Sequence, residues 1–122
     1  MPLTYRIDPV RRIVTVTGDY ADAEAWRALL SEVAADPEYR RGSSFLRDQR
    51  ASENPVSAET VVRIIAVVRE FWQALGVHRA AILTRPGLTD PAVIAHALAD
   101  DEHIPLRAFT NYDEAVSWLQ EK

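Results

Sequence analysis

The segment "SSFLRDQRASENPVSAETVVRIIAVVREFWQALGVHRAAILT", residues 43–84, decides the fold. A short apolar strand is predicted over residues 43–49, a long helix over residues 57–75 and a second short strand over residues 80–84. Gly76 is well placed to end the helix, because glycine adopts the left-handed conformation at no cost. Strands that alternate with helices of this length indicate a largely parallel sheet, wound by right-handed crossovers.

The flanking residues continue this alternation. Residues 3–8 and 12–18 are predicted to form a hairpin around residues 8–11. A helix follows from residue 21, with Asp19 or Asp22 as its N-cap, and ends at Asp36-Pro37. We expect a helix over residues 90–99, a strand over residues 104–109 and a terminal helix capped by Asn111. The predicted fold class is α/β, in the order ββαβαβαβα, with a mixed, mostly parallel five-stranded sheet flanked by helices.

Composition narrows the classes of function. The 122 residues, 48% of them hydrophobic, predict a single domain over residues 1–122. The net charge of −4 disfavours nucleic acid and anionic membranes as partners. Cysteine is absent, which excludes disulfides and thiol chemistry. With neither a signal-peptide core in residues 1–12 nor an apolar run of about 20 residues, we expect a cytoplasmic protein without membrane insertion.

Three loops follow the carboxyl ends of the predicted parallel strands, where open α/β sheets bind ligands. They begin after Asp48, Thr84 and Phe109. The candidate ligand- or partner-binding residues are Asp48, Arg50, Ser52, Thr84 and Arg85. Arg50 and Arg85 could together hold a small anion. The alternative is an Asp48–Arg85 ion pair that organises two of the loops.

Two serines in the first of these loops are candidates for phosphorylation, Ser52 and Ser57. Backbone N–H groups at the amino end of a helix attract anions, and a serine there is an accessible phosphate acceptor. The alternative is structural, since Ser57 is also placed to be the N-cap of the long helix, with Glu59 in its first turn.

No constellation of residues predicts catalysis, a metal site or a cofactor. The sequence has no G-x-S-x-G elbow, no P-loop and no G-x-G-x-x-G. The nearest approach to metal-ligand spacing is His96, Asp100 and His103, but the helix is expected to end near Ala99, which moves His103 off the shared face. If the protein were an enzyme, Asp48 would be the first candidate acid or base.

The long helix has an apolar surface wider than one contact with a sheet requires. We expect part of it to form an oligomer contact. The aromatic residues fall at spacings typical of a core, and lining a cavity for a hydrophobic ligand is the alternative.

The chain resembles a family, the SpoIIAA-like proteins related to STAS (anti-sigma-factor antagonist) domains. The resemblance rests on "YRIDPVRRIVTVTGDYADAEAWRALLSEVAADPEYRRG", "FLRDQR", "AAILT" and "LRAFTNYDEAVSWLQ", which together span nearly the whole chain. It implies a small bacterial regulator that binds partner proteins. In anti-sigma antagonists a serine in an Asp-Ser-Ser-Gly type motif is phosphorylated, whereas the corresponding region here reads "DQRASENPVSAET" and contains no Ser-Ser-Gly.

The leading hypothesis is therefore a non-enzymatic regulatory or protein-interaction domain. Its partner would be a protein, such as a regulatory kinase or a sigma-pathway protein, or a second copy in a homodimer. The alternative is a binder of a small anionic or lipid-like ligand at the carboxyl edge of the sheet, with Arg50, Thr84 and Arg85 holding the head group.

Overall fold

The computed structural model describes residues 2–18, 22–52, 57–86, 89–101 and 103–121. Its elements are β1 (Thr4–Asp8), β2 (Ile13–Thr17), α1 (Ala23–Ala35), β3 (Ser44–Asp48), α2 (Ala58–Leu75), β4 (Ala80–Leu83), α3 (Thr89–Asp101), β5 (Leu106–Phe109) and α4 (Tyr112–Gln120). The α/β class and the mixed five-stranded sheet flanked by helices are confirmed. Among the described residues, no helix combines the length and the apolar character needed to cross a membrane.

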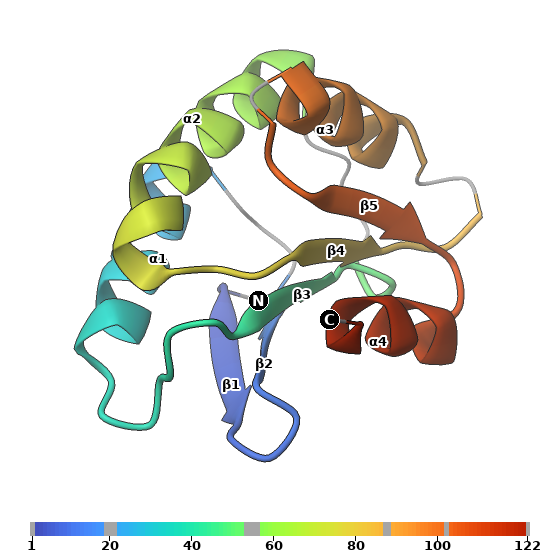
Figure 1. The fold of residues 1–122 in the computed structure, drawn as a ribbon. Coiled ribbons are helices and arrows are strands. Elements are labelled where there is room, and N and C mark those ends of the chain that lie inside the picture. Colours follow the sequence, from blue (N-terminus) through green and yellow to red (C-terminus); the bar gives the residue numbers. More distant parts are fainter. Residues whose placement is uncertain (1, 19–21, 53–56, 87–88, 102, 122) are drawn as a thin grey trace.

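The strands lie in the sheet in the order of the sequence, β1-β2-β3-β4-β5. β1 pairs with β2 in antiparallel fashion, and every later neighbour is parallel. The three crossovers run in one direction along the sheet, so α1, α2 and α3 cover the same face (Figure 1). α4 packs against β3, β4 and β5 on the opposite face.

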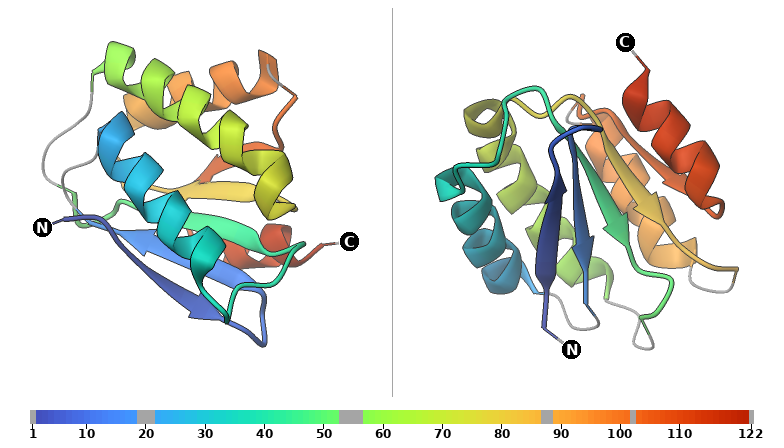
Figure 2. Two further views of the ribbon diagram at one scale, coloured as in Figure 1. Left: turned by 90° about the vertical axis from the view of Figure 1, so that its left-hand side faces the viewer. Right: turned by 90° about the horizontal axis from the view of Figure 1, so that it is seen from below.

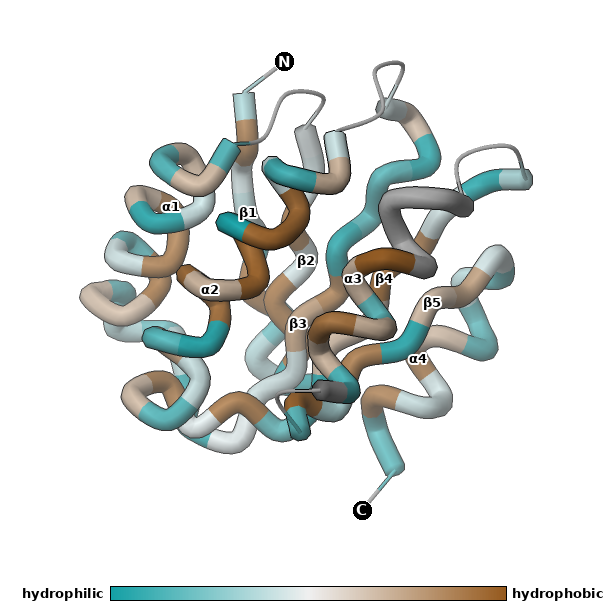
Figure 3. The backbone as a smooth tube through the Cα atoms, turned by 90° about the horizontal axis from the view of Figure 1, so that it is seen from above, coloured by the Kyte–Doolittle hydropathy of each residue, from teal (hydrophilic) through white to brown (hydrophobic). Residues whose placement is uncertain are grey.

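The alternation of side chains along each strand divides the core into two clusters. The larger cluster lies between the sheet and α1–α3, and it includes Val14, Val16, Phe45 and Ile82. The smaller one lies under α4, and it includes Ile13, Leu46, Leu83 and Leu119. In Figure 3 hydrophobic and hydrophilic residues alternate along the helices, as expected for helices with one buried face.

The wide apolar surface of α2 is used within the chain. α2 lies between α1 and α3 and contacts both, so its apolar residues face the sheet and two neighbouring helices (Figure 2). Ile64, Val68, Phe71 and Trp72 pack against the core, and Val62 is 51% exposed. An oligomer contact is therefore not needed to account for this surface.

Polar side chains cap the amino ends of three helices as the sequence predicts. The Asp22, Ser57 and Asn111 side chains accept hydrogen bonds from the backbone N–H groups of Ala25, Thr60 and Glu114. Asp19, the other candidate cap for α1, lies outside the described residues. Gly76 closes α2 in the left-handed region, with φ 60°.

α3 ends at Asp101, two residues past Ala99, so His103 lies beyond the helix as predicted. His103 adopts a φ of 59°, the conformation that glycine usually supplies at a helix end. The N–H of Ile104 then donates to Ala99 O at 2.8 Å, and that of His103 to Asp100 O at 3.1 Å. These two bonds satisfy carbonyls of the last turn, so the helix continues past Ala99 despite its acidic end.

Candidate functional site

The loops after β3, β4 and β5 lie at one edge of the sheet, because these strands are parallel and in register. Asp48 pairs with Leu83, and Leu83 pairs with Phe109. The ladder continues one residue past each strand, since Gln49 N–H donates to Leu83 O and Thr84 N–H donates to Phe109 O, both at 2.9 Å. We call this the carboxyl edge.

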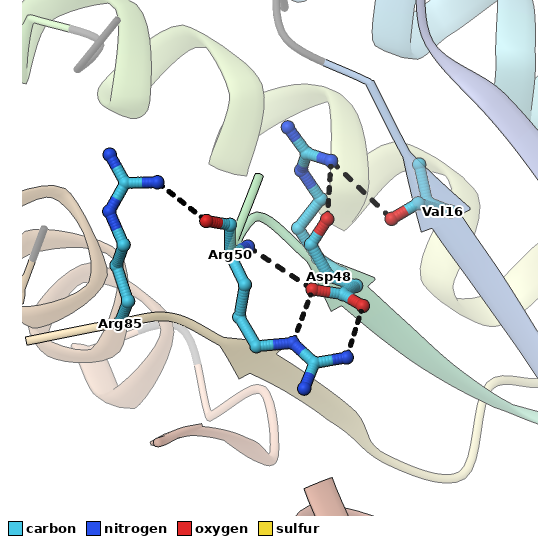
Figure 4. Close-up of polar contacts among 5 residues, drawn as sticks. Val16, Asp48, Arg50 and Arg85 are labelled. Atoms are coloured by element: carbon cyan, nitrogen blue, oxygen red, sulfur yellow. Dashed lines mark hydrogen bonds and ion pairs between the residues drawn. The ribbon is translucent and has the colours of Figure 1, made fainter. Parts of the chain in front are cut away.

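Asp48 and Arg50 form an ion pair at this edge (Figure 4). Nε of Arg50 donates to Oδ1 of Asp48 at 3.0 Å, and Nη2 donates to Oδ2 at 2.9 Å. The backbone N–H of Arg50 also donates to Oδ1, at 3.1 Å. Partial burial by itself would raise the pKa of Asp48, but the hydrogen bonds from Arg50 and the charges of Arg50 and Arg47 outweigh burial and lower it.

Arg85 extends this arrangement to the second loop. Its Nη1 donates to the backbone carbonyl of Arg50 at 2.6 Å (Figure 4). The expected Asp48–Arg85 ion pair is therefore wrong, because the turn after β3 brings both the backbone and the side chain of Arg50 onto Asp48. Arg85 still joins the two loops, through a carbonyl rather than a carboxylate.

The third loop joins the site through an aromatic ring. Cζ of Arg50 lies 5.8 Å from the ring centroid of Tyr112, the first residue of α4, within the range of a cation–π contact. Tyr112 is 39% exposed and Arg50 and Arg85 are exposed, so the three side chains form one accessible surface. We call Arg50, Arg85 and Tyr112 the Arg-Tyr surface.

The hydroxyl residues of the site differ in accessibility. Ser52 is only 7% exposed, and its Oγ donates to Gly18 O at 3.2 Å. Thr84 is 2% exposed and packs inside the edge. Ser57 is exposed, and its Oγ accepts the N–H of Thr60 at 3.2 Å. Of the two candidate phosphorylation sites, Ser57 is therefore the accessible one and Ser52 is enclosed.

Sequence reasoning missed Arg47 and Tyr112. Nη2 of Arg47 donates to Gly18 O at 2.9 Å, and its guanidinium lies 6.0 Å from the ring centroid of Trp26. This arginine ties the end of β2 to the end of β3 on the face covered by α1. The signal was its position two residues after Phe45, since alternating residues of a strand share a face and Phe45 faces the core.

The histidine and aspartate of α3 do not gather with His103. His96, Asp100 and His103 are all exposed, and His103 lies beyond the end of the helix. Across the part of the chain that the structure describes, no group of three or more His, Cys, Asp or Glu residues could hold a metal ion.

Comparison with known proteins assigns no family: the sequence matches no protein-family model, no curated protein and no solved structure. The likeness to SpoIIAA-like proteins thus rests on the residues quoted for it.

Proposed function

We propose that the protein is a non-enzymatic regulatory domain of the SpoIIAA-like, STAS-related kind, which binds a protein partner through the carboxyl edge. The observation that carries this proposal is the Arg-Tyr surface. Its three side chains come from two loops and the first residue of α4, yet contacts through Arg50 hold them together.

The residue types of this surface and its preformed arrangement both support a role in recognition. Arginine and tyrosine are enriched in protein interfaces, where they often account for most of the binding energy. Contacts already made in the free protein reduce the conformational entropy that binding would cost. The surface displays guanidinium groups beside an aromatic ring, so the complementary partner surface carries carboxylates around an apolar centre.

The serines give this proposal a specific form. Ser52 is enclosed and its hydroxyl is occupied, so a kinase would reach it only after the loop opened. Ser57 is accessible at the first turn of α2, on the carboxyl edge itself. A regulatory kinase acting on this domain would therefore modify Ser57, in a context that lacks Ser-Ser-Gly.

The test compares partners captured by three forms of the tagged protein in extracts of the source cells. These are the wild type, an Arg50→Ala/Tyr112→Ala variant and an Arg40→Ala control. Arg40 lies in the loop before β3, at the opposite edge of the sheet, where its Nη1 donates to Pro37 O. We expect a protein that the wild type and the control retain and the double variant loses, measured by quantitative mass spectrometry.

A partner retained equally by all three forms would place the interface elsewhere. If the double variant had a lower unfolding temperature than the control, its loss of binding would not count. Circular dichroism melts of each form belong to the same experiment.

The ligand-binding alternative is less well supported at this edge. Arg50 is already paired with Asp48, so a small anion would gain mainly the charge of Arg85. Thermal-shift screening with acidic metabolites and fatty acids tests it. A stabilising ligand whose effect disappears in Arg85→Ala would favour this alternative over a protein partner.

A further inference from the structure

A recess of about 330 Å³ lies at the opposite edge of the sheet, where the parallel strands begin. Six of its eight described lining residues carry polar side chains: Arg11, Arg12, Ser44, His78, Gln120 and Glu121. They come from the β1–β2 turn, the start of β3, the segment before β4 and the end of α4. Figure 2 shows the hairpin turn, the loop before β3 and the end of α4 at the same end of the molecule.

Hydrogen bonds between these segments shape the recess in the free protein. Ser44 N–H donates to Arg12 O at 2.9 Å, which joins the turn to β3. The Ser44 hydroxyl donates to Leu119 O at 3.3 Å, which joins β3 to α4. His78 N–H donates to Ser43 O at 3.0 Å. A ligand would therefore meet a site that is already formed.

Two exposed guanidinium groups line the recess, and Glu121 is the one carboxylate among its described lining residues. Among the described residues, the side chains of Arg11 and Arg12 have neither a hydrogen bond nor an ion pair. This differs from Arg27, Arg50 and Arg63, each of which is paired with a carboxylate. Uncompensated arginines beside a concave surface attract anions.

The backbone at Arg12 is strained. Its φ is 58°, in the left-handed region that glycine and asparagine occupy more readily. Asp8 holds the turn, because its Oδ1 accepts the N–H groups of Val10 and Arg11 at 3.0 Å and its carbonyl accepts the N–H of Arg12 at 2.9 Å. The protein therefore keeps an arginine where a smaller residue would fit the backbone better, as is typical of functional positions.

The negative groups near the recess are already satisfied. The carbonyls at the end of α4 would repel an anion, but Nη1 of Arg79 donates to Trp118 O at 2.7 Å. Nε2 of His78 lies 2.7 Å from Glu121 O, and a carbonyl can only accept, so Nε2 carries the proton. The Glu121 carboxylate lies 4.0 Å from Nη1 of Arg79, which offsets part of its charge.

From these observations we infer that the recess binds a small phosphate monoester with a polar, hydroxyl-bearing body. Two guanidinium groups match the charge of a phosphate dianion, and each can donate paired hydrogen bonds to phosphate oxygens. Gln120 and Glu121 supply partners for hydroxyl groups. Leu119 is the one large apolar side chain among the described lining residues. The volume is at the lower end for ligand sites, which suits a sugar phosphate better than a dinucleotide.

This site is independent of the proposed partner contact, because the two lie at opposite edges of the sheet. The test is a titration of isotope-labelled protein with glucose 6-phosphate, with inorganic phosphate and with glucose, followed by amide chemical shifts. We expect saturable shifts at Arg12, Ser44, His78 and Gln120 with the sugar phosphate, weaker binding of inorganic phosphate and no binding of glucose.

Two variants and a control make the test specific. Arg12→Gly removes the guanidinium and also relieves the backbone strain, so binding should weaken about tenfold or more while the unfolding temperature stays the same or rises. Arg11→Ala should weaken binding similarly. Arg63→Ala, which removes an exposed arginine of α2 paired with Glu59, should bind as the wild type does.

Three outcomes would overturn the inference. The first is the absence of shifts in the recess up to about 10 mM sugar phosphate, an affinity weaker than about −3 kcal/mol. The second is equal binding by the wild type and Arg12→Gly. The third is inorganic phosphate binding as tightly as the ester, because the body of the ligand would then contribute nothing.

Discussion

Replacing Arg47 with methionine should lower the free energy of unfolding by about 2–3 kcal/mol. Methionine preserves much of the apolar stem that lies near Trp26, but it cannot donate a hydrogen bond. The variant loses the 2.9 Å bond to Gly18 O, together with longer bonds to Asp48 O at 3.2 Å and Val16 O at 3.4 Å. Only the shortest bond is given its full contribution to the free energy of unfolding, about 1.5–3 kcal/mol for a hydrogen bond from a charged group. The two longer bonds are weaker.

Ser52 makes this prediction sharper, because its hydroxyl donates to the same Gly18 carbonyl. Ser52→Ala alone should cost about 1 kcal/mol, since Arg47 still satisfies that oxygen. The double variant leaves the carbonyl without either donor, so its cost should exceed the sum of the two single costs by about 1 kcal/mol.

Urea unfolding followed by circular dichroism measures all three variants. With a slope of about 1–3 kcal/mol/M, Arg47→Met should lower the midpoint by about 1–2 M. Arg63→Met is the matched control, since it removes an exposed pair between residues one helical turn apart and should cost less than about 0.5 kcal/mol. A cost for Arg47→Met no larger than the control's, or strict additivity in the double variant, would refute the reasoning.

Three further predictions concern the site and the core. Ser57→Ala should cost about 1 kcal/mol by removing the N-cap of α2, and Ser57→Asp should cost much less because aspartate also caps. An equal loss of stability for both variants in thermal unfolding would show that capping is not its cause. Asp48 has a lowered pKa, so its ion pair stabilises the protein above the ordinary carboxyl pKa of about 3.9, and this stability is lost as the pH falls below that value. In Asp48→Asn the free energy of unfolding should therefore fall less steeply with decreasing pH in this range. An unchanged pH dependence would contradict the pairing. Leu46→Ala should cost about 3 kcal/mol in urea unfolding, because Leu46 is fully buried beneath α4, and a cost below about 1 kcal/mol would indicate that α4 collapses onto the sheet.

The sequence predicted the elements because their signals are local. Apolar periodicity, Asp22, Ser57, Asn111 and Gly76 act within a few residues of the structures they define, so they can be read without knowing the fold. The placement of Asp48 and Arg85 at one edge followed from parallel pairing alone. These predictions required no side-chain conformation.

The failures needed information that spacing does not contain. From the sequence, either Arg50 or Arg85 could have paired with Asp48. The choice of Arg50 depends on how the chain turns after Gln49. α3 extends two residues past Ala99 because His103 adopts a left-handed conformation, which its residue type does not predict. The recess requires the β1–β2 turn and the end of α4 to meet, although they are about a hundred residues apart in the sequence.

The two edges of the sheet use arginine in opposite ways, and this suggests how their binding should respond to salt. At the carboxyl edge Arg50 is neutralised by Asp48 and Arg85 donates to a carbonyl, so recognition there depends on shape and aromatic contact as well as charge. At the opposite edge Arg11 and Arg12 are not compensated, so binding there would depend mainly on charge. Raising the salt concentration should therefore weaken the sugar phosphate more than the protein partner, because exposed charges are screened beyond a Debye length of about 10 Å at 0.1 M and 3 Å at 1 M. A partner as sensitive to salt as the sugar phosphate would show instead that charge dominates both edges.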